Sequence, residues 1–364
     1  MPYNPVFMRK AIQCAEKARG TCSPNPFVGA VIVKEGKIIS TGWTQHYGGD
    51  HAEIQALKKA GNEAKGAEIY VSLEPCAHYG KTPPCAEALV KAGVSTAYIG
   101  ILDPNPLVAG KGIKILENSG IKVELGFMQQ EISRQLEYFL CRMTKQRPFV
   151  IWKTAMSLDG RVAADDGSSR WITGDASRKL VHKLRSEVDV ILTGIGTILK
   201  DDPLLNSRLP RRLRQPVRVV LDPLLDTPLD SQIVQTARQY QTLFFCTDCA
   251  PKDSHAAIKD KGIELVVITC GDVILDLRKV LTELHNRGYY SVLLECGSTL
   301  STAFLKAGLV DKAYLFYAPK LLGGSRTAVN DLGIRSIEGA MDYHFESFKR
   351  SGNDLLCIAY PKEI

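Results

Sequence analysis

Segments typical of β-strands and segments typical of α-helices alternate along almost the whole of this 364-residue chain. Short apolar runs such as residues 69–73 and 188–192 are followed by stretches with apolar side chains at every third or fourth position. Strands and helices in this order form a sheet with helices packed on its faces. The alternation therefore predicts an α/β protein that binds ligands at the carboxyl ends of its strands.

A short polar stretch that ends in proline, residues 144–148, interrupts this pattern. Residues 131–143 before it have the apolar spacing of one helix, and residues 149–152 after it begin a strand. Domains of roughly 150 residues are typical, so a chain of this length corresponds to about two. We therefore expect two α/β domains, residues 1–147 and residues 148–364.

Charge and composition exclude several classes of protein. The net charge of +7 is spread thinly over the chain, so it predicts neither a nucleic-acid partner nor a membrane partner, although it suits a phosphate ester. The N-terminus lacks the features of a signal peptide, and no apolar run approaches the ~20 residues of a membrane span. We expect a cytoplasmic protein with reduced thiols, in which clustered cysteines bind metal rather than form disulfides.

One histidine and two cysteines stand at positions typical of a catalytic zinc site. His51 precedes a predicted helix, Cys76 follows a predicted strand, and Cys85 begins the next helix. Three protein ligands leave the fourth zinc position to a water molecule, which zinc makes acidic enough to act as hydroxide. Glu53, two residues after the histidine, is the predicted general base and acid that moves the proton to the leaving group.

Simpler explanations exist for the same residues. Asp50 and Glu53 have the spacing of a helix capping box, which needs no catalytic role. His46 is a conceivable fourth ligand, and four protein ligands would make the zinc structural. A non-catalytic protein stabilised by zinc is therefore one alternative at this stage.

The second half of the chain carries weaker signals, which indicate nucleotide binding. Residues 295–299 end a predicted strand and open a helix, where backbone N–H groups favour a phosphate. Residues 193–197 also follow a strand, but they lack the third glycine of a dinucleotide fingerprint, and a tight turn explains them equally well. From these residues alone we infer nucleotide binding and no particular reaction.

The motifs of the first half resemble those of zinc nucleobase deaminases. His51-Ala52-Glu53 and Pro75-Cys76 match that pattern, although eight residues instead of two separate the cysteines. Residues 23–30, 74–85 and 103–112 are similar to the deaminase half of the bifunctional riboflavin-biosynthesis deaminase/reductase family. The resemblance implies a cytidine-deaminase-like fold, with Zn²⁺ held by His51, Cys76 and Cys85 and with Glu53 as catalyst. It also implies substrate contacts from Asn25, His78 and Lys81.

Motifs of the second half are similar to the reductase half of the same family, which implies a dihydrofolate-reductase-like fold that uses NADPH. They are residues 153–161, 171–173, 201–205, 295–297 and 318–324. The residues implied to contact the cofactor are Ala155, Trp171, Thr197, Asp201, Gly297, Ser298, Thr299 and Leu300. The residues implied to contact the substrate are Lys153, Ser169, Arg185, Leu205, Arg208 and Glu295.

The arginines of this half are expected to differ in role. Arg185 and Arg208 have the chemistry to bind a 5′-phosphate through bidentate hydrogen bonds. Arg211, Arg212 and Arg214 are expected to be solvated surface charges.

The resemblance implies a bifunctional enzyme of riboflavin biosynthesis, which forms homo-oligomers. Its first activity is the zinc-dependent deamination of 2,5-diamino-6-(5-phosphoribosylamino)pyrimidin-4(3H)-one. Its second is the NADPH-dependent reduction of 5-amino-6-(5-phosphoribosylamino)uracil to the ribitylamino product. In one departure from the family, Thr44 stands where a histidine is common, so a substrate contact is either lost or taken over by His46.

The alternative function from another class is a tRNA base deaminase fused to a nucleotide-binding module. Such an enzyme needs a positively charged groove near the zinc and surfaces that stack a flipped base. The thin spread of positive charge disfavours it.

Overall fold

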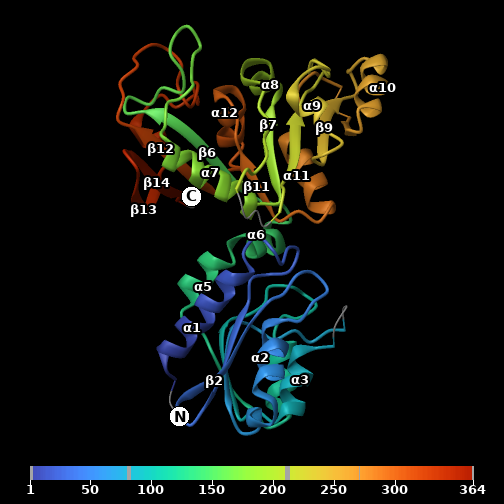
Figure 1. Ribbon diagram of the computed structural model, residues 1–364, viewed down its shortest axis with the longest axis vertical. Helices are drawn as coiled ribbons and strands as arrows, with labels where there is room; N and C mark the ends of the chain where they lie inside the picture. The colour runs from blue at the N-terminus through green and yellow to red at the C-terminus, as the bar shows by residue number, and fades with distance from the viewer. Residues whose placement is uncertain (1–2, 80–82, 210–213, 270, 363–364) are drawn as a thin grey trace. The chain divides into compact units, whose positions relative to one another are not determined.

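The computed structural model describes residues 3–79, 83–209, 214–269 and 271–362. The chain divides into two compact units, Met1–Gln146 and Arg147–Ile364. Each unit has one sheet with helices around it (Figure 1), so the α/β class predicted from the alternation is confirmed. Within the described ranges, none of the helices is long and apolar enough to cross a bilayer.

A five-stranded sheet in the order β2-β1-β3-β4-β5 forms the centre of the first unit. Strands β1 and β2 form a hairpin, and β1 is antiparallel to β3, whereas β3, β4 and β5 are parallel. The strands are β1 (Gly29–Lys34), β2 (Lys37–Trp43), β3 (Glu68–Leu73), β4 (Thr96–Ile101) and β5 (Lys122–Leu125). Because β3 and β4 are parallel, their carboxyl ends meet at one edge of the sheet.

Helices cover both faces of this sheet (Figure 1): α1 (Pro5–Ala15) and α5 (Gln129–Gln135) lie on one side, and α2 (Ala52–Ala60) and α3 (Cys85–Ala92) on the other. Glycine allows close packing on both faces. A Cβ atom at Gly29 would lie 1.9 Å from the carbonyl oxygen of Ala11 in α1. At Gly42 it would lie 2.0 Å from the carbonyl oxygen of Ala52 in α2. These glycines set the distance between the sheet and its helices.

The single helix predicted over residues 131–143 is wrong. The structure has two helices there, α5 and α6 (Glu137–Lys145). They are separated at Leu136, whose φ of −96° and ψ of 13° leave helical geometry. The remaining helix of this unit, α4 (Lys111–Asn118), packs against α3.

The sheet of the second unit has nine strands in the order β10-β9-β8-β7-β11-β6-β12-β14-β13. The run from β10 to β12 is parallel, and β14 and β13 complete it as an antiparallel hairpin. The strands are β6 (Phe149–Ser157), β7 (Val190–Gly194), β8 (Val217–Leu221), β9 (Thr242–Thr247), β10 (Glu264–Ile268), β11 (Ser291–Leu294), β12 (Lys312–Ala318), β13 (Tyr343–Ser351) and β14 (Asp354–Pro361).

The two faces of this sheet differ in what they bury. Side chains in register on one face, including Val150, Val190, Val217 and Val292, pack with helices α11 (Leu277–Asn286) and α12 (Ser298–Lys306) in one apolar core. Helix α7 (Asp175–Glu187) contributes nothing to that core. The next register row, Ile151, Leu293, Ile191 and Arg218, faces the other way because side chains alternate along a strand.

Several elements of the second unit were not predicted from the sequence. They are α8 (Ile195–Asp201), α9 (Gln232–Gln235), α10 (Lys252–Asp260) and the hairpin β13–β14. Helices α8 and α9 have seven and four residues, which leaves little periodicity to detect.

Candidate functional site

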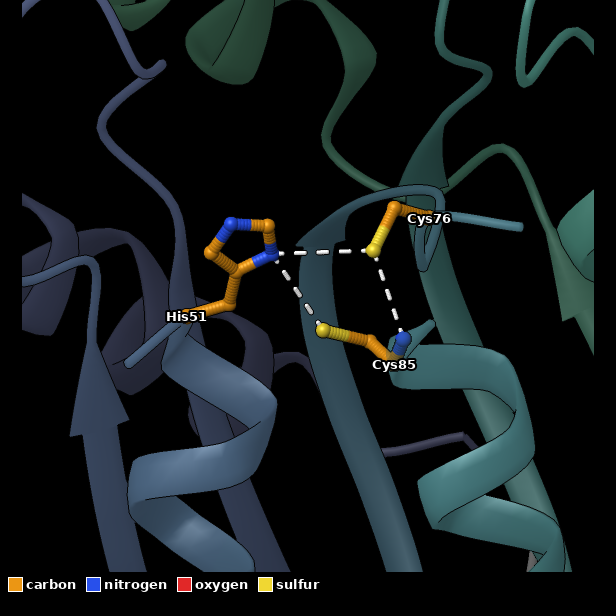
Figure 2. A group of neighbouring side chains, drawn as sticks. All are labelled: His51, Cys76 and Cys85. Carbon is orange, nitrogen blue, oxygen red and sulfur yellow. Dashed lines mark hydrogen bonds between the residues drawn. The ribbon is translucent and has the colours of Figure 1, made fainter. Parts of the chain in front are cut away.

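His51, Cys76 and Cys85 converge in the first unit (Figure 2). The fold brings them together because His51 caps α2, Cys76 follows β3, and Cys85 is the first residue of α3. The Nδ1 atom of His51 lies 3.6 Å from the Cys76 Sγ atom and 3.3 Å from the Cys85 Sγ atom. Tetrahedral bonds of about 2.0 Å to nitrogen and 2.3 Å to sulfur separate such ligand atoms by roughly 3.5 Å. The donor set and its spacing therefore fit zinc.

The surroundings of one of the two sulfur atoms, that of Cys76, favour its thiolate form. Hydrogen bonds donated by Cys85, from its thiol and from its backbone N–H, lower the pKa of Cys76 to about 4, and His51 contributes to this shift. The hydrogen bond with Cys76 in turn raises the pKa of His51. A thiolate is the form of cysteine that binds metal.

Glu53 lies in the first turn of α2, and its side chain is buried. Burial raises the pKa of Glu53 to about 7, which suits a group that accepts and releases a proton near neutral pH. The capping-box explanation is wrong, because the helix cap is His51 and the Asp50 carboxylate accepts hydrogen bonds from Lys58 Nζ at 2.7 and 2.8 Å.

The group of possible ligands has three members. In the described part of the chain, His51, Cys76 and Cys85 form the group able to hold a metal, and His46 is not in it. His46 is exposed. The arrangement leaves a coordination position for a water molecule or substrate, as in catalytic zinc sites.

Sequence reasoning missed the part played by Glu74, which lies two residues before Cys76. Its buried carboxylate accepts hydrogen bonds from the backbone N–H groups of Asp103, Gly110, Gly112 and Ile113, at 3.0 to 3.3 Å. It therefore ties the loop after β4 to the strand that precedes the zinc ligand. The signal in the sequence was an acidic residue directly after the end of a predicted strand.

The predicted pocket residues of the first unit are only partly placed. Asn25 is half-buried and donates its backbone N–H to the Cys22 carbonyl at 2.8 Å. The Nδ1 atom of His78 is buried without a hydrogen-bond partner among the described residues. Lys81 lies outside the described residues. The hydroxyl of Thr44 accepts a hydrogen bond from the Val28 backbone N–H at 3.1 Å, so it serves the protein's own backbone.

A second cluster of charged side chains lies at the carboxyl end of β11 in the second unit. Arg185 of α7 donates to both carboxylate oxygens of Glu295, from Nε at 2.6 Å and from Nη2 at 3.0 Å. The Nζ atom of Lys153 in β6 lies 3.6 Å from the same carboxylate. Burial alone would raise the pKa of Glu295, but Arg185 and Lys153 outweigh it and hold that pKa at about 2. The structure thus brings together three of the residues for which the resemblance implies substrate contacts.

Residues 202–208, which we name the substrate loop, run beside this cluster. The Asn206 carbonyl accepts a hydrogen bond from Arg185 Nη1 at 3.1 Å, and its side-chain oxygen accepts one from Arg208 Nη1 at 3.1 Å. The Ser207 hydroxyl donates to the His182 carbonyl of α7 at 3.0 Å. Leu205 is buried and Arg208 is exposed. Asn206 and His182 are residues near this cluster that sequence reasoning missed.

The residues predicted to contact the cofactor surround the ends of β7 and β11. Gly297 caps α12 in extended geometry, so Ser298, Thr299 and Leu300 form the first turn of that helix. A Cβ atom at Gly194, the last residue of β7, would lie 3.3 Å from a side-chain carbon of Leu300. The strand ends predicted to bind nucleotide are therefore neighbours.

The other predicted contact residues of the second unit are spread around these strand ends. Thr197 and Asp201 lie in α8, and Ala155 is half-buried in β6. Trp171 is 60% exposed and its carbonyl accepts a hydrogen bond from Lys320 Nζ at 2.7 Å. Ser169 is half-buried in the loop that precedes it. Arg170 in that loop donates to the Asp201 carbonyl, which brings these segments together.

The expectation that Arg214 is a solvated surface charge is wrong. It forms an ion pair with the buried Asp189. The same carboxylate accepts hydrogen bonds from the backbone N–H groups of Tyr290 and Ser291 at 2.8 and 3.0 Å, and Arg214 supplies its counter-charge. Arg211 and Arg212 lie outside the described residues.

Comparison with known proteins identifies the family. The family model described as the cytidine and deoxycytidylate deaminase zinc-binding region matches residues 3–101, and the model described as the RibD C-terminal domain matches residues 148–357. The riboflavin biosynthesis protein RibD of Aquifex aeolicus is 39% identical over 352 residues, which cover 96% of each chain. The chain belongs to the RibD family. The RibD of Escherichia coli is 38% identical over 362 residues, with 96% of this chain and 97% of that one covered.

Solved RibD structures agree over the whole length. A structure of Acinetobacter baumannii RibD matches with a TM-score of 0.89 and 38% identity, covering 99% of both chains. That of a Thermotoga maritima diaminohydroxyphosphoribosylaminopyrimidine deaminase/5-amino-6-(5-phosphoribosylamino)uracil reductase matches with a TM-score of 0.86 and 33% identity, covering 98% of both.

Membership of the RibD family confirms the resemblance read from the motifs. The protein is a bifunctional deaminase and reductase of riboflavin biosynthesis, with a zinc-binding deaminase domain and a pyrimidine reductase domain. The predicted cytidine-deaminase-like and dihydrofolate-reductase-like folds are confirmed with it. The tRNA-deaminase and non-catalytic alternatives are therefore set aside.

Proposed function

We propose that the first unit deaminates 2,5-diamino-6-(5-phosphoribosylamino)pyrimidin-4(3H)-one by hydrolysis. The observation that carries this proposal is the convergence of His51, Cys76 and Cys85 near the buried Glu53. When bound there, zinc lowers the pKa of a water molecule to near neutral. Glu53 holds the proton removed from that water at its carboxylate and returns it to the exocyclic nitrogen, which leaves as ammonia.

The second unit, in this proposal, reduces 5-amino-6-(5-phosphoribosylamino)uracil to the ribitylamino product with NADPH. When bound, NADPH supplies a hydride to the ribosyl carbon. The first turn of α12, residues 298–300, offers free backbone N–H groups to a cofactor phosphate. Glu295 and Lys153 orient the ribosyl hydroxyl groups in this proposal, which their position beside the same strand end supports.

The roles of the two arginines can be separated. Arg185 is committed to Glu295 through Nε and Nη2 and to Asn206 through Nη1. Arg208 is exposed and donates one hydrogen bond, to the Asn206 side chain, so most of its five donors are available. We therefore assign the 5′-phosphate mainly to Arg208.

Two further properties belong to this proposal. We infer that the enzyme works in the cytoplasm, where Cys76 and Cys85 stay reduced and available to zinc. We infer also that copies of the chain associate, supported by apolar side chains exposed on the hairpin β13–β14. Phe345, Phe348 and Leu355 are 62%, 56% and 40% exposed there. Sedimentation velocity of the wild type and of Phe348→Lys tests this, since a monomeric wild type contradicts it.

The test of the proposed reactions uses purified full-length chain. Metal analysis should find one zinc ion per chain, and the phosphorylated diaminopyrimidinone should yield one ammonia per substrate. NADPH oxidation should then follow, and should begin without ammonia release when deaminated substrate is supplied. Oxidation of NADPH without prior deamination of the diamino substrate would contradict the proposed order of steps.

A further inference from the structure

A cationic side chain is buried inside the second unit with no acidic partner among the described residues. Arg218 is the second residue of β8 and is completely buried. Arg218 pairs in register with Ile191 on β7, and the same row of paired residues continues through Leu293 on β11 to Ile151 on β6. Because side chains alternate along β6, Lys153 projects from the same face as Ile151. Arg218 therefore lies on the sheet face that carries the charged cluster, opposite the apolar core.

The hydrogen-bond partners of Arg218 are neutral. Its guanidinium donates to the hydroxyls of Thr242 and Thr236, at 2.6 and 2.8 Å, and it lies 5.2 Å from the ring centre of Tyr240. It also donates to carbonyl oxygens at 3.0 to 3.3 Å, those of Leu204, Ile233 and Tyr240. Burial lowers the pKa of Arg218 to about 10, with no carboxylate to oppose the shift.

A buried charge without a counter-charge is costly, and an apolar side chain in its place is often equally stable or more so. What an apolar side chain cannot do is satisfy carbonyl groups that point into the interior. The carbonyls that Arg218 satisfies belong to the substrate loop, to α9 and to the segment before β9. The guanidinium therefore holds separate segments of chain around one point.

The contact with Leu204 matters most for the site. The next residue, Leu205, has a φ of 47°, a conformation that L-residues rarely adopt. The loop then passes Asn206, which bonds to Arg185, and ends at Arg208. A second hold on the same loop comes from α9, where the backbone N–H of Gln232 donates to the Asp202 carboxylate at 2.7 Å. The path that presents Arg208 is thus fixed from the side of β8 and α9.

We propose that Arg218 is a positioning residue for the reductase, which sets the path of the substrate loop by holding the Leu204 carbonyl and thereby places Arg208 for the substrate phosphate. The inference rests on the proposed function, in which Arg208 binds that phosphate. Arg218 itself contacts neither substrate nor cofactor, because it is fully buried.

The test compares Arg218→Met and Arg218→Lys with Leu284→Ala. Leu284 is buried in the apolar core on the opposite sheet face, so its truncation lowers stability without touching the loop. The measurements are KM for the phosphorylated, deaminated substrate, KM for NADPH, and inhibition by inorganic phosphate. A misplaced binding group costs up to about a hundredfold, so we expect that rise in substrate KM for Arg218→Met and a smaller rise for Arg218→Lys. KM for NADPH should change less than about twofold, and phosphate inhibition should weaken in parallel with substrate binding.

The outcomes separate this inference from the proposed function. A purely structural role lowers the active fraction and leaves both KM values unchanged, as expected for Leu284→Ala, and that result for Arg218→Met would overturn the inference. Should Arg218→Met not fold, Arg218→Lys decides, because a lysine cannot reproduce the planar fork of donors. An unchanged substrate KM in Arg208→Ala would instead overturn the phosphate assignment itself.

Discussion

The charged cluster of the reductase unit should stabilise the fold as well as the site, and replacing Glu295 by glutamine tests this. A carboxyl whose pKa falls from its ordinary 4.5 to about 2 on folding gains about 3 kcal/mol in its ionised form. Little of this is lost to solvent screening, since the side chain is 10% exposed. Burial lowers the pKa of Lys153 despite Glu295, so the ion pair with Arg185 supplies most of the gain. At pH 7 we expect Glu295→Gln to lower the free energy of unfolding by about 3 kcal/mol.

The sign of the pH dependence follows from the lowered pKa. The stabilisation is fully present above pH 4.5 and is lost as the pH falls from 4.5 toward 2. The difference between the wild type and Glu295→Gln should therefore shrink to about 1.4 kcal/mol at pH 3. The measurement is urea unfolding monitored by hydrogen exchange, in which peptides from β6 and β11 report the stability of this unit alone.

The control for this experiment is Glu283→Gln. Glu283 accepts a hydrogen bond from Arg287 one helical turn away, at 2.7 Å, and its side chain is 33% exposed. Partly exposed pairs of this kind contribute about 0.5 kcal/mol or less. A loss below about 1 kcal/mol for Glu295→Gln at pH 7, or a difference that does not shrink at pH 3, would refute the reasoning.

Three further predictions concern the reactions. Glu53→Gln should keep its zinc and lose ammonia release by a factor of about 10² to 10⁴, while reduction of deaminated substrate continues; retained ammonia release contradicts the role of Glu53. Arg208→Ala should raise KM for the phosphorylated substrate by about tenfold or more and leave KM for NADPH nearly unchanged, and equal weakening of both argues against the phosphate contact. Removal of zinc by a chelator should stop ammonia release and lower the unfolding temperature of the first unit; loss of NADPH oxidation on deaminated substrate would contradict separate sites.

The parts of the molecule that the sequence predicts well are those whose chemistry is local. His51 and Glu53 are two residues apart, so one helix end carries ligand and candidate catalyst together. Cys85 was correctly expected at the start of a helix. In each case the physical requirement involves neighbours in the sequence.

What the sequence could not predict depends on contacts between distant segments. Glu74 is an acidic residue like many others until the fold places the N–H groups of Gly110 and Gly112 around its carboxylate. Arg218 follows the same logic, since its carbonyl partners come from three separate segments. Arg214 was misjudged for the same reason, because its partner Asp189 is 25 residues away. A buried charge can be recognised only once the fold shows which distant groups surround it.

The unusual spacing of the two cysteines shows why geometry rather than sequence distance defines the metal site. In the common deaminase pattern two residues separate the cysteines, and here eight do. The sulfur atoms nevertheless meet one nitrogen of His51, because Cys76 lies three residues after the end of β3 and Cys85 opens α3. The backbone N–H of Cys85 donates to the Cys76 sulfur at 3.3 Å. The two anchors are fixed by the sheet and by the helix, so the chain between them is free to differ in length. The added residues include His78, and the cost of a longer loop grows only slowly with its length. The two ligand positions thus depend on where the strand ends and the helix begins, and contact of His78 with the substrate stays a prediction.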